Sequence, residues 1–156
     1  MKISTKGKYG LRAMIDLAQY SEQEAGSISS IAQRQKISES YLEQLVAKLK
    51  KAGLVVSIRG AAGGYRLARP ASGISVGDVL RALEGDVRAV ICTAQTEEGC
   101  EGEELCVTKY VWQRINESIE KTVDEMMLDQ LVAESRKAQE KAKNHDVDYS
   151  RNSCSG

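Results

Sequence analysis

The apolar positions in the first 53 residues follow the three-to-four-residue spacing of amphipathic helices. Three segments share this spacing: 5–20, 27–35 and 39–53. Ser27 and Ser38 stand where each can cap the helix that follows, and Gly53 stands where a helix end favours a left-handed residue. Two short helices joined by a turn, the second rich in lysine, predict a helix-turn-helix.

The pattern changes after Gly53 to two short runs that favour β-strands. LVVSIRG and GYRLARP are joined by a glycine-rich connection at residues 60–64, which suits a hairpin. A hairpin directly after the second helix of a helix-turn-helix is the wing of a winged helix. Pro70 closes this part of the chain.

The second half contains a helix-start signal and a longer apolar stripe. A capping box at residues 75–78 predicts a helix that Gly85 ends. Residues 107–127 predict a long helix whose apolar side chains recur in alternating three- and four-residue steps. These positions are Trp112, Ile115, Ile119, Thr122 and Met126. We expect this seam to meet the same helix of a second copy; the alternative is packing on its own domain.

Together the elements predict a fold that is mainly α with a small β-hairpin wing, a winged helix-turn-helix plus a long dimerisation helix. A last amphipathic helix through Leu128 and Leu131 fades into a polar tail too poor in apolar residues to pack. We therefore expect a winged-helix DNA-binding domain at 1–84, a cysteine loop at 85–107, dimerisation helices at 108–143 and a disordered tail at 144–156.

Charge divides the chain although the 156 residues have a formal net charge of zero. Residues 1–69 carry twelve basic and five acidic residues, a net charge of +7, whereas residues 70–156 carry ten and seventeen, a net charge of −7. A basic half favours nucleic acid as a partner. No apolar run is long enough for a membrane span and no cleavage pattern of a signal peptide follows the N-terminus, so we expect a cytoplasmic protein.

The second helix of the helix-turn-helix presents candidates for contacts to double-stranded DNA. Opposite its apolar face lie Ser40, Tyr41, Glu43, Gln44 and Lys48. Glutamine pairs with adenine and glutamate accepts from the cytosine amino group, whereas lysine suits phosphates. The alternative is that these side chains merely solvate the helix.

The expected wing supplies a further DNA-binding candidate. Arg59 lies beside the glycines at its tip. An arginine there can enter a narrow minor groove or contact a phosphate only.

Three cysteines, Cys92, Cys100 and Cys106, share a polar, glycine-rich segment. Three thiols in one loop of a reduced protein favour a soft metal centre over disulfides. A zinc site and a thiol redox switch are the alternatives. We expect Cys154, in the tail, to be a bystander.

No pattern of catalytic residues is recognisable. The glycines at 60, 63 and 64 do not fit a dinucleotide fingerprint, no phosphate-binding loop occurs, and the single histidine, His145, lies in the tail. We expect the protein not to be an enzyme.

Three segments carry a family resemblance. MKISTKGKYGLRAMIDLA, SESYLEQLVAKLKKAGLV and SIRGAAGGYRLARP closely resemble the winged-helix regulators typified by IscR, NsrR and CymR, and the resemblance covers residues 1 to about 130. It implies a homodimer with a long crossing helix. It also implies base contacts from Ser40, Glu43 and Gln44, and minor-groove contact from Arg59.

The same resemblance implies that Cys92, Cys100 and Cys106 bind an iron–sulfur cluster, with 2Fe–2S favoured over 4Fe–4S. The first gap holds seven residues, where well-known members have five. The histidine that IscR-like proteins place three residues after the third cysteine is here Lys109. NsrR-like proteins use an acidic residue in the first helix of the partner subunit. The matching region of this chain has the basic residues Lys8 and Arg12 instead. The remaining candidates for the fourth ligand are Glu103, Glu104 and Cys154.

We therefore expect a DNA-binding transcriptional regulator, a repressor of the IscR type, that senses iron–sulfur or redox status. One alternative is a CymR-like repressor of cysteine metabolism that responds through a partner enzyme, or a thiol switch without a cluster. An alternative of another class is an iron–sulfur carrier or electron-transfer protein.

Overall fold

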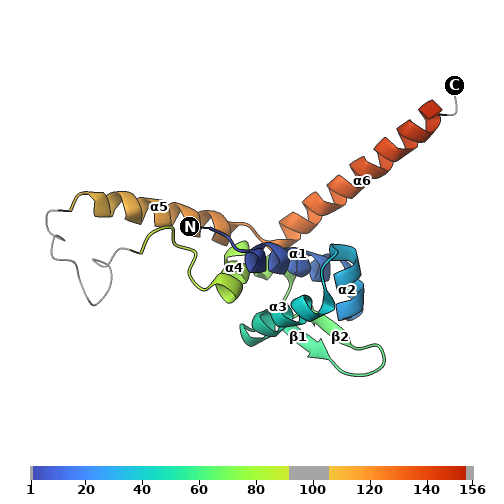
Figure 1. The fold of residues 1–156 in the computed structure, drawn as a ribbon, viewed down its shortest axis with the longest axis horizontal. Helices are drawn as coiled ribbons and strands as arrows, with labels where there is room; N and C mark the ends of the chain where they lie inside the picture. The colour runs from blue at the N-terminus through green and yellow to red at the C-terminus, as the bar shows by residue number, and fades with distance from the viewer. Residues whose placement is uncertain (1, 92–105, 154–156) are drawn as a thin grey trace.

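A computed structural model describes residues 2–91 and 106–153, with side chains described to residue 146. The elements run in the order α1 (Thr5–Tyr20), α2 (Ile28–Gln35), α3 (Glu39–Lys51), β1 (Val55–Ile58), β2 (Gly64–Leu67), a 3-10 turn η1 (Ala71–Gly73), α4 (Val76–Glu84), α5 (Thr108–Glu125) and α6 (Leu128–Ser153). In Figure 1 the first four helices and the hairpin form one body, from which α5 and α6 extend in different directions. The predicted winged helix with a long added helix is confirmed.

Local capping explains where the short helices begin. The Ser27 hydroxyl accepts the N–H of Ser30 at 3.1 Å, and the Ser38 hydroxyl accepts the N–H of Tyr41 at 3.2 Å. Both bonds satisfy a helix N–H that has no partner within the helix. Lys36, in the left-handed conformation with φ 55°, forms the turn between α2 and α3. The two predicted caps and the turn are therefore present.

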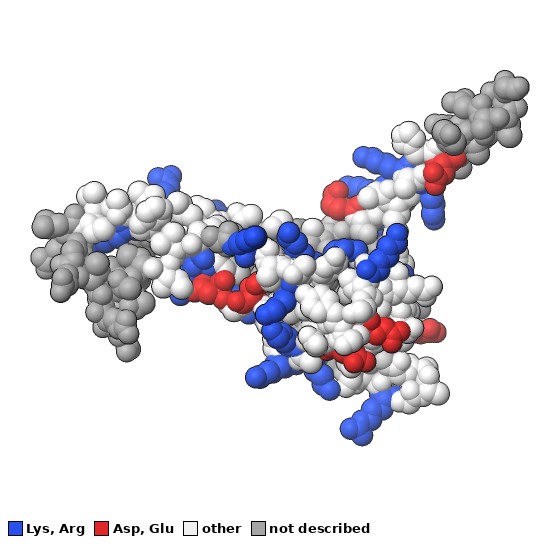
Figure 2. Space-filling model, in the orientation of Figure 1, with Lys and Arg blue, Asp and Glu red and all other residues white. Residues whose placement is uncertain are grey.

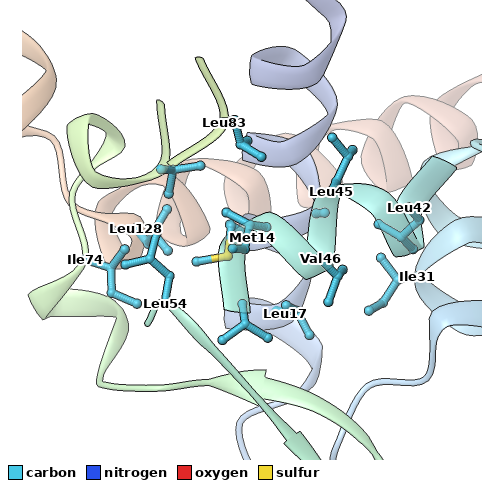
Figure 3. Packing of buried hydrophobic residues seen from close by; sticks show 14 of the residues in the cluster. Met14, Leu17, Ile31, Leu42, Leu45, Val46, Leu54, Ile74, Leu83 and Leu128 are labelled. Carbon is cyan, nitrogen blue, oxygen red and sulfur yellow. The ribbon is translucent and has the colours of Figure 1, made fainter. Parts of the chain in front are cut away.

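An aliphatic core holds the winged-helix domain together. It gathers buried side chains from α1, α2, α3, β1 and α6, which Figure 3 shows converging. Fully buried examples are Met14, Ile31, Leu42, Leu49 and Leu128. Burying each such side chain contributes about 1.5–3 kcal/mol. Because Leu128 begins α6, the C-terminal helix is part of the N-terminal core.

The wing is held against the rest of the domain. β1 pairs antiparallel with β2, with Val55 opposite Leu67. Tyr65 exchanges two backbone hydrogen bonds of 2.8 Å with Gly26, in the loop between α1 and α2. On the other side, the Lys50 ammonium of α3 donates to the Ser57 hydroxyl at 3.0 Å. These contacts set the position of the hairpin relative to α3.

The long helix α5 is attached to α4 at its C-terminal end. Arg81 forms a two-point ion pair with Asp124, with N–O distances of 2.7 and 2.9 Å. Just beyond, the Val76 N–H donates to the Met126 carbonyl at 2.8 Å. The side chains of the apolar seam are not used in these two contacts: Ile115 and Met126 are 38% and 36% exposed. No helix of the described part of the chain is long and apolar enough to cross a membrane.

The C-terminal tail differs from the expectation of disorder after residue 143. Helix α6 continues to Ser153. The tail begins KAQEKAK, and Ala, Lys, Glu and Gln all have high intrinsic helix propensity. Low apolar content had indicated that the tail cannot pack, but a helix that starts in a packed core can continue without packing. Residues 154–156, with Cys154, lie outside the described residues.

Candidate functional site

Helix α3 presents a polar face opposite its packed face. Leu42, Leu45 and Leu49 are buried. Ser40, Glu43, Gln44 and Lys48 are all exposed and lie on the other side of the helix. Ala47 is exposed in the middle of this face. Its small side chain lets the helix backbone approach a flat or grooved partner closely.

Tyr41 lies differently from the other residues of α3 that were expected to contact DNA. Its ring is half-buried and packs edge-on against the ring of Tyr9 on α1, with centroids 6.1 Å apart. The Arg12 guanidinium lies 5.1 Å from the centre of the Tyr9 ring on the same helix. Tyr41 therefore joins α3 to α1, and part of its surface is used for packing.

Arg59 is exposed at the tip of the wing, directly after β1. The turn beyond it is tight: Gly60 has φ 112°, and a Cβ at Gly63 would lie 2.4 Å from the Ile58 carbonyl oxygen. Only glycine fits these two positions, so the tip stays narrow around the arginine. Figure 2 shows Lys and Arg side chains over α3 and the hairpin region. The structure thus brings a basic wing tip and the polar face of α3 into one domain.

A buried ion pair fixes α2 on α1 and so supports the helix-turn-helix. Asp16 is fully buried and accepts two hydrogen bonds from Arg34, at 2.7 and 2.9 Å, and one from Gln35 at 2.9 Å. The hydrogen bonds to Asp16 raise the pKa of the Arg34 guanidinium. These three charge-assisted hydrogen bonds give the buried Asp16 carboxylate the partners that its charge requires.

Of the three cysteines predicted to bind a metal, Cys106 is the one that lies within the described residues. It is partly exposed, one residue before the cap of α5, and its Sγ lies 3.1 Å from the Thr108 hydroxyl. That hydroxyl, the N–H groups of Lys109 and Thr108 and the charge of Lys109 lower the pKa of the thiol. The thiolate is the form that binds metals, so this residue fits an iron–sulfur or zinc ligand. Lys109 stands at the position where the IscR-like pattern has a histidine ligand. Its ammonium lies 5.5 Å from the centre of the Tyr110 ring.

The remaining ligand candidates, Cys92, Cys100, Glu103, Glu104 and Cys154, lie outside the described residues. Within residues 2–91 and 106–153, no group of three metal-ligating side chains comes together. A complete ligand set therefore stays a prediction.

Two polar residues that sequence patterns did not single out hold the start of the cysteine segment. Glu84, the last residue of α4, accepts three hydrogen bonds from the first turn of α1: from the N–H and hydroxyl of Ser4 and from the N–H of Gly7. Asn116 of α5 is only 5% exposed and binds the backbone of Ala89 and Val90. Neither residue carries a sequence signal, because the partners of both lie far away in the chain.

Comparisons with known proteins agree with this geometry. Residues 3–134 match the model of the Rrf2 family, described as iron-dependent transcriptional regulators. The HTH-type transcriptional regulator IscR of Yersinia enterocolitica is 42% identical over 132 residues, which cover 85% of this chain and 79% of the relative.

Solved structures lead to the same group. CymR, the global cysteine regulator of B. subtilis, is 42% identical with a TM-score of 0.71, over 85% of this chain and 97% of CymR. T. potens IscR is 45% identical with a TM-score of 0.71, over 89% and 91% of the two chains. The matches span the winged helix and α5 together, which confirms the resemblance carried by the three sequence segments. The chain belongs to the Rrf2 family of iron-dependent transcriptional regulators.

Proposed function

We propose that this transcriptional regulator of the IscR type is a homodimeric, cytoplasmic repressor whose affinity for its operator changes with an iron–sulfur cluster held by Cys92, Cys100 and Cys106. The observation that carries the proposal is the exposed polar face of α3 in one domain with the Arg59 wing tip, in a chain whose Cys106 stands at the start of α5. The relatives named above are IscR proteins, and the matching family is described as iron-dependent.

In this proposal, α3 of each subunit enters the major groove of double-stranded DNA. Ser40, Glu43 and Gln44 meet base edges, because they lie on the exposed face towards the N-terminal half of the helix. Lys48 lies further along the same face and meets a phosphate. The Arg59 guanidinium at the narrow tip enters the neighbouring minor groove.

The exposed seam of α5 supplies the dimer interface. Two copies of α3 must lie about 34 Å apart to meet successive turns of DNA on one face. Helix α5 is anchored to α4 by Arg81 and Asp124, so pairing of two α5 helices sets the separation of the two DNA-binding domains.

The metal centre uses thiolates as ligands. The Thr108 hydroxyl lowers the pKa of Cys106 and so favours its thiolate form, and the two other cysteines complete a three-sulfur set for which 2Fe–2S is favoured. Glu103, Glu104 and Cys154 are the candidates for a fourth ligand. A bound cluster supplies a redox-sensitive link between the two ends of the segment that joins α4 to α5.

Anaerobic purification tests the metal centre. The wild-type protein is expected to be coloured, with iron and sulfide in stoichiometric amounts, and single alanine substitutions of Cys92, Cys100 or Cys106 are expected to abolish the colour. Cys154→Ala is the matched control and should retain it. Absence of iron from reconstituted wild type would overturn the cluster, and zinc in its place would indicate the zinc alternative.

A second candidate function is supported by the similarity to CymR, a global cysteine regulator. In this alternative the chain would respond to a partner enzyme, and its operator affinity would be unchanged by removal of iron but changed by addition of the enzyme. A thiol switch would instead respond to oxidant in iron-free protein. An iron–sulfur carrier would show no sequence-dependent DNA binding.

A further inference from the structure

Ala47 differs in chemistry from the other exposed residues of α3. The helix, Glu39–Lys51, lies wholly within the described residues, and its other exposed side chains are all polar or charged. Ala47 stands one turn after Glu43 and Gln44, at the three- and four-residue spacing that places side chains on one face of a helix. The surface proposed to enter the major groove therefore carries one methyl group among hydrogen-bonding groups.

The backbone of α3 fixes the position of this methyl group. Alanine has no side-chain rotamers, so its Cβ lies where the helix places it. The opposite face of the helix is packed through Leu42, Leu45 and Leu49, each no more than 1% exposed. Near the start of the helix, the ring of Tyr41 packs against Tyr9 of α1. A methyl group on a helix held this firmly loses no side-chain entropy when a partner covers it, unlike the long side chains around it.

The major groove offers an apolar group that such a methyl can meet. Among the four bases, thymine presents a methyl group there, and alanine is one of the side chains that contact it. A longer polar side chain in the place of Ala47 would have to pair with the edge of a base. The methyl group of alanine instead gains by excluding water from another apolar group.

The helical spacing limits which base pair Ala47 can meet. Three residues of an α-helix advance about 4.5 Å along its axis, and successive bases lie about 3.4 Å apart along one strand of DNA. The advance from Gln44 to Ala47 is thus little more than one base-pair step. Ala47 therefore meets a base close to the pair that Gln44 contacts.

We propose that Ala47 is a specificity-determining residue of the DNA interface: its methyl group packs against the C5-methyl group of a thymine within about two base pairs of the pair that Gln44 contacts. The inference rests on the proposed function, because it requires α3 to lie in the major groove. It adds an apolar preference for thymine to the hydrogen-bonding preferences of Glu43 and Gln44.

The test compares thymine with deoxyuridine, which has the same base-pairing edge but lacks the C5-methyl group. The probe is a duplex that the full-length wild-type protein selects from a pool of random sequences. Each thymine of a selected half-site is replaced in turn by deoxyuridine, and fluorescence anisotropy measures the affinity for each duplex. At the thymine that Ala47 contacts, wild type is expected to bind the deoxyuridine duplex about four-fold more weakly, the effect of one buried methyl group.

Ala47→Gly removes the methyl group of the protein and should bind the thymine and deoxyuridine duplexes equally at that position. Ala52→Gly is the matched control. Ala52 is exposed at the C-terminal cap of the same helix, five residues on and therefore on a different side, so its variant should keep the four-fold difference of wild type. Because glycine also weakens a helix, Ala47→Asn is the second variant. It places a polar group at an exposed position where no packing is lost, and it should remove the difference as well.

The possible outcomes separate this inference from the proposed function. A difference between thymine and deoxyuridine that both Ala47 variants lose and Ala52→Gly keeps supports the contact. If Ala47→Gly fails to fold, Ala47→Asn decides. A wild-type difference in the Ala47 variants would overturn the contact, as would the absence of a methyl-sensitive thymine near the base pair that Gln44→Ala affects. A relaxed base preference in Gln44→Ala would still keep α3 in the major groove, whereas a selection that yields no preferred sequence would overturn both.

Discussion

At the residue scale, Glu84 acts as a helix cap supplied from the far end of the domain. Ser4 occupies the cap position of α1, but its side chain makes no capping bond to the helix. Glu84 takes over that role, with its carboxylate 2.9 Å from the Gly7 nitrogen and 3.0 Å from the Ser4 nitrogen. A carboxylate at a helix N-terminus is also favoured by the helix dipole.

Glu84→Gln is expected to lower the free energy of unfolding by about 1 kcal/mol at pH 7, the usual value of a helix cap. The hydrogen bonds from Ser4 and Gly7 lower the pKa of Glu84. The charged form therefore stabilises the fold above the pKa of the unfolded chain, and this contribution is lost as pH falls through the lower, folded-state pKa. Urea unfolding of wild type and variant should differ at pH 7 and converge in acid. Glu24→Gln, at an exposed loop position, is the control; a difference that stays constant with pH would contradict the assignment.

Single residues of α3 and of the wing should separate base recognition from phosphate binding. Gln44→Ala is expected to relax base preference at one position per half-site and Arg59→Ala to weaken operator binding, each by about 1–3 kcal/mol. Lys48→Ala should weaken binding to all sequences alike and lower the salt slope by about one unit. Binding titrations against an operator and its single-base variants make the comparison. An unchanged base preference in Gln44→Ala would reject its role.

At the element scale, α5 has two different faces. One contacts α4 and the chain after it through Asn116 and Val123. The other carries Ile115, Met126 and Val111, each more than a third exposed. An apolar stripe of this kind on a long helix indicates a helical partner, because exposed apolar surface of this extent is otherwise unfavourable in water.

Replacing Ile115 and Ile119 with aspartate is expected to give monomers and weaker operator binding, because charges on the seam lose hydration without gaining partners. Light scattering at micromolar concentration measures the assembly. Gln113→Asp, outside the seam on the same helix, should leave the dimer intact. A wild-type monomer under these conditions would contradict the interface.

At the scale of the whole molecule, the cysteine segment starts and ends on structure that is tied to the DNA-binding domain. Glu84, at its start, holds the N-terminus of α1, and α1 packs against α3 through Tyr9 and Tyr41. Met126 and Leu128, beyond the far end of α5, join the start of α4 and the core. A structural change in the cysteine segment therefore has two routes to α3. One runs through Glu84 and α1, and the other runs through α5 and the core.

Removing the cluster with a chelator is expected to change operator affinity about 5- to 150-fold, the usual range of coupling between two sites. Fluorescence anisotropy with labelled operator measures the shift. Cys106→Ala should bind with the affinity of the chelated protein and show no further response to chelator. Hydrogen exchange in α1 to α3 should stay protected throughout. Equal affinity of loaded and cluster-free protein would exclude this coupling.

The sequence by itself determined the local elements, because their signals are local. Ser27, Ser38 and Ser75 act on backbone groups within three residues, and the periodic leucines of α3 select its buried face without knowledge of the partner. The exposed positions of Ser40, Gln44 and Lys48 followed from the same periodicity. The helical tail was missed because low apolar content reports on packing, whereas helix formation also depends on propensity.

Only the tertiary structure decided the contacts between distant segments. Nothing near Glu84 in the sequence indicates that it caps α1, nothing near Gly26 indicates its bridge to Tyr65, and Asn116 does not differ in pattern from the polar residues around it. Tyr41 was expected on the DNA-facing surface, and the ring of Tyr9 explains why it is half-buried. The same physical reason applies to the contacts of all four residues, Glu84, Gly26, Asn116 and Tyr41. A hydrogen bond or ring contact depends on a few ångströms between atoms, and for residues far apart in the chain that distance is set by how the whole core packs.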